Sequence, residues 1–431
     1  MRKAALGLLV AGVLALSMWL YVERVLIGHQ VADAAQTGVP RGNLSDLYPR
    51  WLGSRELLQH RRDPYGPQVT HDIQVGYYGR ALGTGLDPER NADPRDQQGF
   101  AYPVYVAFLL WPTLDLPFRT VQRGFAYLLL ALTAASVPLW AYAIGWRPGA
   151  LVLGAAVLLT VGSFPTLQGY ELQQLSLLVG ALLAGCAAAL MRGWTVPAGV
   201  LLAVATIKPQ VAAPMVAWLV LWAAGNWRQR QGLIWGFTAS MAALLAGAEI
   251  VAPGWIGRFG TALAAYQQYT GGISLLDTLF TSLVGRILAL ALVAGLAWLA
   301  WRMRHAPAGT PGFALVLALV PAVTLLIIPT WAPYNQVLLV PGLLLLAARR
   351  AIIWPRGRTA RYVYLMPWVL VGWPWLAALG LVLSIAVLPL ATVQRGWTLP
   401  LYTSLFIPFG VLVALAYAAR RNVRQAGEAA A

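Results

Sequence analysis

Most of the fifteen carboxylates of this chain fall in one stretch, between Asp33 and Asp96. An ionised carboxylate can take a proton from a hydroxyl group, which is how a general base assists a group-transfer reaction. Asp46 is the best-placed acid, because the residues around it read as the start of a helix, and a helix N-terminus favours the ionised form. The alternative is an ordinary N-capping or solvated aspartate. We predict that Asp46 is a catalytic base.

The sequence that follows Asp46 predicts a short helix over residues 46–59. Leu47, Trp51 and Leu58 approximate an apolar stripe on one face of this helix. We expect such a helix to lie on the surface of a bilayer and to hold Asp46 at the interface.

The composition places the rest of the chain in a membrane. Of 431 residues, 59% are hydrophobic and 11% are charged, and the mean hydropathy is +0.65. Soluble domains carry about 25% charged residues, so this chain has too few polar groups to cover a water-exposed surface. It holds many apolar runs of the length that spans a bilayer as a helix, and the period-two alternation of a membrane β-barrel is absent.

The positive charge follows the membrane topology. The net charge is +16, but the basic residues stand at the ends of apolar runs, as the positive-inside rule expects, and do not form a nucleic-acid surface. The single cysteine, Cys186, excludes an internal disulfide, and the few histidines form no zinc-spacing cluster.

Arginine clusters fix a predicted order of about twelve spans, all helical. The apolar segment Tyr102–Pro117 is short and broken by prolines, and treating it as surface-lying or re-entrant puts every Arg cluster inside. A cleaved signal peptide over residues 4–22 is the alternative to a retained first helix. The predicted regions are a first span over 1–27, an extracytoplasmic loop over 28–119, a helix bundle over 120–419 and a cytoplasmic tail over 420–431.

Lys208 is the only lysine besides Lys3, and it lies between two apolar runs at the predicted outer face. A lone cation there departs from the positive-inside trend, so it is a candidate partner for the phosphate of a lipid-linked substrate. The alternative is that its side chain reaches up to lipid headgroups.

Further polar residues stand in turns and at the outer ends of apolar runs. Polar groups at membrane depth often line a cavity; simple turns, water-satisfied helix ends and an interfacial aromatic belt are the alternatives. The residues that we predict to bind substrate are Tyr48, Arg50, Asp63, Tyr65, His71, Glu171, Gln173, Gln174, Lys208, Gln210, Tyr334 and Asn335.

Six short motifs occur in a recognisable order: Asp46-Leu47-Tyr48, Asp63-Pro64-Tyr65, Phe100-Ala101-Tyr102-Pro103, Gln173-Gln174-Leu175-Ser176, Ile207-Lys208-Pro209 and Pro333-Tyr334-Asn335-Gln336. Over about residues 5–350, the chain resembles the polyprenol-phosphate-dependent glycosyltransferases of the GT-C superfamily, and most closely glycosyltransferase family 87, which contains bacterial membrane mannosyltransferases and their relatives. Two features depart from the family pattern: Val104 stands where a second proline is common, and residues 83–98 resemble no motif of the family.

The resemblance implies a GT-C-type fold in which one span is followed by a large extracytoplasmic loop with amphipathic helices and an essential aspartate, and then by a bundle. It implies a polyprenyl-phosphate sugar as donor, often mannose, with Asp46 as the base and a lipid or glycan as acceptor. Lys208, with an outer-loop arginine or His71, would balance the departing phosphate. The expected partners are membrane lipids, the donor and the acceptor, with no nucleic acid. No metal ligand is assigned, although a divalent cation at the acidic loop stays open.

The expected location is the cytoplasmic membrane of a bacterium, with the site facing outward. The alternative function is a lipid or solute transporter or a flippase, but the sequence shows no internal repeat, and Glu249 is the only acid well inside a late apolar run. A non-catalytic scaffold would leave the clustered acids unexplained.

Overall fold

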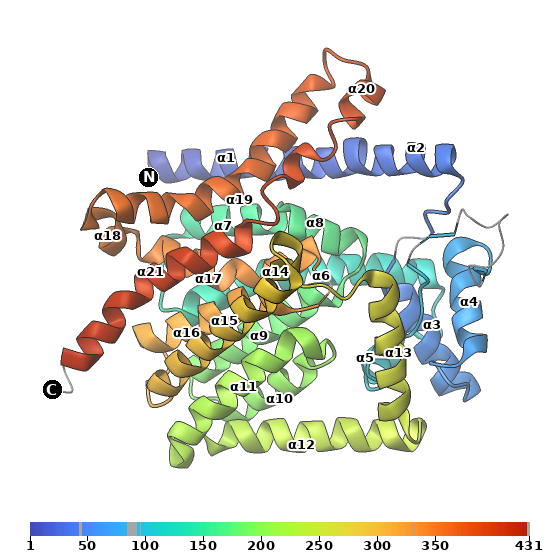
Figure 1. Ribbon diagram of the computed structural model, residues 1–431, viewed down its shortest axis with the longest axis horizontal. Coiled ribbons are helices and arrows are strands. Elements are labelled where there is room, and N and C mark those ends of the chain that lie inside the picture. Colours follow the sequence, from blue (N-terminus) through green and yellow to red (C-terminus); the bar gives the residue numbers. More distant parts are fainter. Residues whose placement is uncertain (43–44, 84–92, 95, 330, 429–431) are drawn as a thin grey trace.

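The computed structural model describes residues 1–42, 45–83, 93–94, 96–329 and 331–428. These residues form helices joined by turns and short extended segments (Figure 1). Helix α1 (Arg2–Leu20) begins and α21 (Ile407–Glu428) ends at one end of the bundle, on the left of Figure 1. The small helices α3 (Leu47–His60) and α4 (Pro67–Tyr78) lie at the other end.

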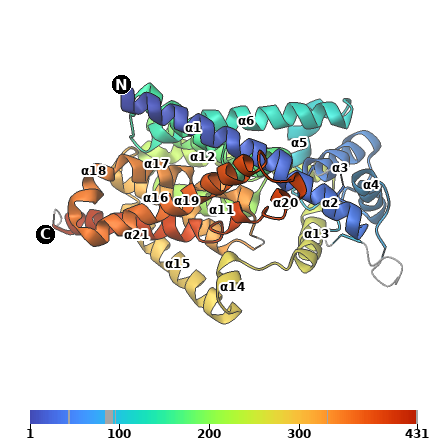
Figure 2. The same cartoon turned by 90° about the horizontal axis from the view of Figure 1, so that it is seen from above.

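The first helix is longer than the sequence predicts. A π-helical turn, Tyr21–Leu26, joins α1 to α2 (Ile27–Thr37), so the chain stays helical beyond the predicted boundary at residue 27 (Figure 2). The left-handed Gly38 then ends it, at φ 69°. Residues 34 and 35, which the signal-peptide alternative placed near a cleavage site, lie inside α2.

Two apolar helices form the centre of the bundle. Almost every side chain of α9 (Leu175–Met191) and α16 (Pro311–Ile327) is buried, as expected of helices that are hydrophobic on all sides. Around them pack α6 (Phe118–Ala143), α10 (Thr195–Ala205), α11 (Pro209–Gly225) and α17 (Val340–Ala348).

The outer helices expose apolar surface that only lipid can cover. Five helices are long and apolar enough to cross a membrane: the α1–α2 helix, α6, α12 (Trp227–Val251), α15 (Ser282–Met303) and α19 (Arg358–Ser384). In α12 only 11% of the most apolar window is buried. Water-exposed apolar surface of this extent is not found on soluble monomers. The protein is therefore a multi-pass membrane protein.

Counted by helix length and apolar composition, the described residues contain five to seven candidate spans, fewer than the twelve or so predicted. Two bent pairs could add two spans, one being α7 (Ala150–Val161) with α8 (Phe164–Glu171), bent by 51°. The other joins Pro333–Ala348 to Arg350–Arg356, bent by 55°. Helices α9, α10, α11, α16 and the apolar part of α21 have only 10–17 residues. Every segment that was predicted to span overlaps a helix, but the count of about twelve stays a prediction.

The proline-rich segment 102–117 holds only α5 (Val106–Leu110) and the 3-10 turn η3 (Trp111–Thr113). A five-residue helix is far too short to span a bilayer. Tyr105, just before α5, donates from its hydroxyl to the backbone oxygen of Thr206 at 2.9 Å. This bond fastens the loop region to the turn between α10 and α11.

Helix α3 is not a surface-lying amphipathic helix. Leu47 and Trp51 are buried on one face of the helix, and Glu56, which points to the opposite face, is buried as well. Helices α4, α5 and α6 pack around it, so the environment is protein on several sides. The prediction that only an apolar stripe of this helix would be buried was wrong, because tertiary contacts bury its polar faces as well.

Helix α13 (Trp255–Thr270) follows α12 and stands beside α3, α4 and α5 (Figure 1). Arg230, at the start of α12, donates to backbone oxygens of Trp222 and Arg304 at 2.7 and 2.8 Å. This contact joins two arginine patches that were predicted to share the inner face. The remaining helices are α14 (Leu275–Leu279), η4 (Pro333–Leu339), α18 (Arg350–Ile353), η5 (Trp354–Arg356), α20 (Leu390–Gln394) and η6 (Leu399–Leu401).

Candidate active site

A cavity of about 390 Å³ lies where the loop region meets the bundle. Its walls come from the N-terminus of α3, the turn before α9, the N-terminus of α11, α13, and the segment from the end of α16 into η4. Seven of the predicted site residues line it: Asp46, Arg50, Gln174, Lys208, Gln210, Tyr334 and Asn335.

Two contacts hold Asp46 against the turn that precedes α9. Its backbone N–H donates to the backbone oxygen of Leu172 at 2.9 Å. Its carboxylate oxygen Oδ2 accepts a hydrogen bond from Nε2 of Gln174. The turn itself is shaped by Gln173, whose φ of 46° lies in the left-handed region, and this reversal places Gln174 at the N-cap of α9.

Lys208 occupies the N-cap position of α11 and is 4% exposed. Its ammonium group donates to Ser176 Oγ at 2.6 Å, to Asn335 Oδ1 at 3.3 Å and to Gln174 Oε1 at 3.4 Å. The Tyr334 ring lies 4.9 Å from Nζ, in a cation–π arrangement. All these partners are neutral, so no direct contact cancels the charge, and desolvation lowers the pKa of Lys208 to about 7. An anionic group beside Lys208 would favour its charged form.

Gln174 therefore links the acid to the cation. Its amide nitrogen donates to Asp46 and its amide oxygen accepts from Lys208. Because an amide has a donor at one end and an acceptor at the other, it can satisfy both groups and still keep them apart. A carboxylate and an ammonium in direct contact would neutralise each other.

Arg50 brings a second cation to the cavity wall from the first turn of α3. One guanidinium nitrogen donates to the backbone oxygen of Asp46, and another donates to the Tyr102 hydroxyl at 2.5 Å. The guanidinium also stacks on the Tyr102 ring, 3.9 Å from its centroid. These contacts fix the Arg50 charge beside Asp46 but do not pair it with the Asp46 carboxylate.

Side chains from α4 and the turn before it hold the backbone of the segment Asp96–Tyr102 in place. Tyr78 donates to the backbone oxygen of Asp96 at 2.6 Å, Gln74 donates to that of Gln97 at 2.8 Å, and Tyr65 donates to that of Tyr102 at 2.6 Å. The segment forms one wall of the cavity, so these bonds position the loop groups that face Asp46.

The surroundings of Asp46 favour its protonated form. Desolvation raises the pKa of Asp46 to about 6, while the Arg50 and Lys208 charges and the Gln174 hydrogen bond oppose this shift. The charge of Asp96 adds to the rise. A carboxyl group with a pKa near 6 is a stronger base than an ordinary aspartate and is still mostly ionised at neutral pH.

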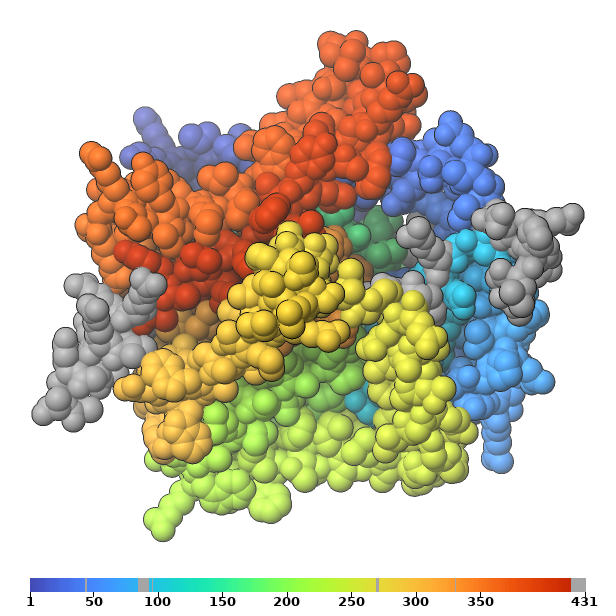
Figure 3. All heavy atoms as spheres, viewed as in Figure 1, coloured from blue at the N-terminus to red at the C-terminus, as the bar shows by residue number. Residues whose placement is uncertain are grey.

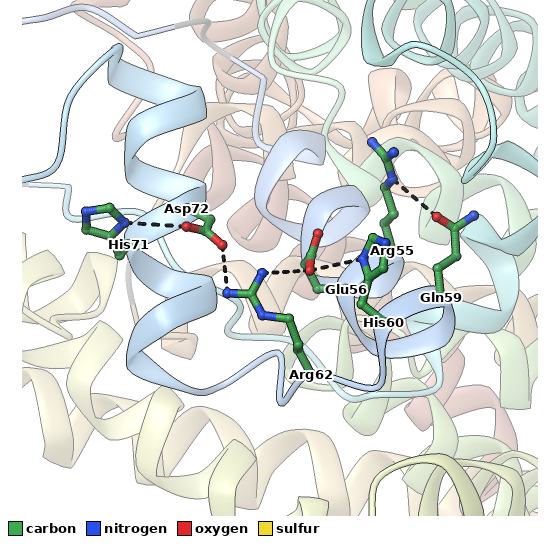
Figure 4. Close-up of polar contacts among 7 residues, drawn as sticks. All are labelled: Arg55, Glu56, Gln59, His60, Arg62, His71 and Asp72. Atoms are coloured by element: carbon green, nitrogen blue, oxygen red, sulfur yellow. Dashed lines mark hydrogen bonds and ion pairs between the residues drawn. The ribbon is translucent and has the colours of Figure 1, made fainter.

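Six predicted site residues do not line this cavity, and His71 lies clearly elsewhere. It is exposed on α4 and contacts Asp72 at 3.4 Å. Figure 4 shows this pair at one end of a chain of contacts that runs through Arg62 to Glu56 and His60. The predicted pairing of His71 with a phosphate beside Lys208 is therefore not supported by its position.

The other five lie in three places. Tyr48 packs against Phe118, with ring centroids 4.8 Å apart, and Gln173 donates back to the carbonyls of Tyr170 and Glu171. Glu171 ends α8. Asp63 and Tyr65 line a neighbouring cavity. A substrate-binding role for these residues stays a prediction.

Several further groups that line the cavity or hold its residues were not predicted from the sequence. Tyr102 and Ser176 stood in quoted motifs but were not chosen, and Asp96 ends the acid-rich stretch. Gln98, Tyr266 and Gln267 carried no signal, because nothing in the sequence says which face of α13 meets the loop. The described residues contain no group of three or more His, Cys, Asp or Glu side chains that could hold a metal ion, and residues 84–92, with two of the acids, lie outside the described part.

Comparison with known proteins identifies a family. The model of "Glycosyltransferase family 87" matches residues 100–329, which include the motifs at 100–103, 173–176 and 207–209 but not Asp46 or Asn335. No curated protein and no solved structure matches the chain. Because the match covers more than half of the 431 residues and the outer helices require lipid, the protein belongs to glycosyltransferase family 87 and is a membrane glycosyltransferase.

Proposed function

We propose that the protein moves a hexose, with mannose as the first candidate, from a polyprenyl-phosphate donor to a hydroxyl group of a lipid or glycan acceptor. The observation that supports the proposal is the Gln174 bridge, which holds the Asp46 carboxylate and the Lys208 amino group at one cavity without direct contact between them. The donor phosphate lies on the Lys208 side, and the acceptor hydroxyl lies on the Asp46 side.

The residues divide the reaction between them. The acceptor oxygen attacks the anomeric carbon, and its proton passes to Asp46. Since Gln174 occupies Oδ2, the receiving atom is Oδ1. The bond between the anomeric carbon and the phosphate oxygen breaks, and polyprenyl phosphate leaves with the electron pair. Direct displacement of this kind inverts the anomeric configuration.

Lys208 and Arg50 stabilise the charge on the leaving phosphate. Fixed cations in a site that excludes water act more strongly than in solution and need no reorganisation during the reaction. The phosphate is already a good leaving group, so it requires charge stabilisation more than protonation. The proposed location is the cytoplasmic membrane of a bacterium. The active site would face outward, where the lipid donor would meet its acceptor.

Asp46→Asn tests the proposal. The purified variant is given radiolabelled polyprenyl-phosphate-mannose with candidate acceptors, and we expect transfer to fall at least about 100-fold, the range of general-base catalysis. Asp33→Asn is the matched control, since Asp33 is exposed on α2, and it should keep full activity. Unchanged transfer by Asp46→Asn would show that Asp46 is not the base. Solute uptake into liposomes by the wild type, without any sugar transfer, would favour a transporter.

A further inference from the structure

A second cavity of about 560 Å³ adjoins the first. It lies between the loop region and α13, which Figure 3 shows in yellow on the front face beside the loop helices in blue. The two cavities share the wall residues Gln98, Gly99, Ala101 and Tyr266. The two cavities are therefore neighbours along this wall, one of them beside Asp46.

The charged groups of this cavity are paired. Arg258 on α13 lies 3.5 Å from Asp63 of the loop, and both side chains keep more than a third of their surface exposed. This differs from Lys208, which touches only neutral partners. A site whose charges already balance suits a neutral ligand better than a phosphate, so the second cavity is unlike the donor side of the first.

The remaining lining is of the kind that binds sugar hydroxyls. Asp63 and Arg258 also have other partners, because Asp63 Oδ1 accepts from the backbone N–H of Tyr65 at 3.1 Å and Arg258 donates to the backbone oxygen of Pro253 at 2.9 Å. The carboxylate oxygens of Asp63 keep further lone pairs for sugar hydroxyls, and Gln74 and Gln98 add amides that already donate to Gln97 and Asp96. The Tyr65 ring offers a flat face, and its hydroxyl is anchored on the Tyr102 backbone at 2.6 Å. Rigid aromatic faces with fixed polar groups at their edges are a usual lining for small-molecule sites.

The face of α13 that closes the cavity is kept open by small residues. Gly257, Thr261, Ala262 and Ala265 line it at helical spacing. A Cβ added to Gly257 would meet no atom within 4 Å, so packing does not require a glycine there. The small side chains leave space in the cavity opposite its polar wall.

We infer that this second cavity binds a carbohydrate acceptor of more than one sugar ring, with its reactive ring beside Asp46 and the following rings against the Asp63–Arg258 pair. The inference rests on the proposed function and extends it from an unspecified acceptor to an oligosaccharide. It also assigns Arg258 and Gln74 to acceptor binding.

The test compares acceptor length in two matched variants. Gly257→Trp puts a large side chain into the lining of the second cavity. Gly260→Trp puts the same side chain on the same helix at a position that does not line the cavity; both glycines are exposed, and a Cβ added at either meets open space. The acceptors are tagged manno-, gluco- and galacto-oligosaccharides of one to four rings, with polyprenyl-phosphate-mannose as donor. The measured quantity is the ratio of KM for one ring to KM for four rings.

For the wild type and Gly260→Trp we expect a ratio of at least about ten in one series, which corresponds to one hydrogen bond to a charged group. For Gly257→Trp and Asp63→Asn we expect the ratio to fall towards one, with the thermal unfolding temperature unchanged. A wild-type ratio near one in every series, or a ratio that survives Gly257→Trp, would overturn the inference.

Saturation-transfer NMR of the four-ring saccharides without donor separates the two proposals. Binding that Gly257→Trp abolishes and Gly260→Trp keeps supports the second cavity even if no transfer from polyprenyl-phosphate-mannose occurs, in which case the proposed donor is wrong. Transfer that proceeds with no such binding overturns the second cavity alone.

Discussion

Two clusters of polar residues in this protein differ in how they hold their charges. The surface chain is His71, Asp72, Arg62, Glu56 and His60 on and between α3 and α4 (Figure 4). There Arg62 contacts both carboxylates directly, each at 2.8 Å. The cavity cluster is Asp46, Gln174, Ser176, Lys208 and Asn335, where an amide separates the acid from the cation. Direct pairing neutralises charge, whereas separation by a neutral bridge preserves a base and a cation for a substrate.

Replacing the cavity cation is expected to have the largest effect on this contrast. Lys208→Met keeps the length of the side chain but removes the charge, and transfer should fall about 100- to 1000-fold, the usual effect of losing one fixed group that stabilises developing charge. Single-turnover rates with labelled donor measure it. Wild-type rates in this variant would mean that the phosphate is bound elsewhere.

The pH dependence tests the state of Asp46. Its pKa is raised to about 6, and the ionised form is the proposed base, so transfer should fall as pH drops through that value. Desolvation lowers the pKa of Lys208 to about 7, so transfer should also fall as pH rises through that value and the cation loses its charge. Below the pKa the ionised fraction decreases by about tenfold per pH unit. Because the Lys208 charge lowers the Asp46 pKa, the residual activity of Lys208→Met should have its midpoint at higher pH. A midpoint near pH 4 in the wild type would contradict the desolvated environment.

The bridge itself gives a smaller effect. Gln174→Met removes the hydrogen bond to Asp46 that lowers its pKa, so the midpoint of the rate profile should move up and the rate at neutral pH should fall about tenfold, as for one lost hydrogen bond to a charged group. The measurement is the full pH–rate profile of the variant. If the midpoint does not move, the amide does not control the base.

The surface chain should give the smallest effect. Arg62→Gln breaks the contacts to Glu56 and Asp72, but partly exposed ion pairs contribute little, and nothing in this chain lines the first cavity. Transfer should be unchanged, with at most a slight decrease in the thermal unfolding temperature. A large loss of transfer in a well-folded variant would extend the active site to α4.

Several elements were predictable because their signals are local. The apolar runs became helices, and the proline-broken segment after Tyr102 holds a helix too short to span. Residues 46–59 became α3, shifted by one residue. Asp46, Gln174, Lys208 and Asn335, which charge topology predicted on one side of the membrane, line one cavity; their roles stay predictions.

Other features were missed because they depend on long-range packing. Helix α3 is buried on several sides, which its own apolar pattern does not show. The positions of His71 and Gln173 follow from how α4 faces solvent and how the turn before α9 is folded. The role of α13 in closing both cavities had no sequence signal, since its face towards the loop is made of small residues.

The sequence by itself determined that this chain belongs in a membrane and that most of its acids lie in one hydrophilic stretch. It also singled out Lys208 as a lysine between two apolar runs. Hydropathy and the order of charges are properties of the chain alone. Only the tertiary structure decided that Gln174 stands between Asp46 and Lys208. That placement depends on contacts between residues 128 and 34 positions apart, and these contacts affect how strongly the acid is desolvated and keep it from pairing directly with the cation.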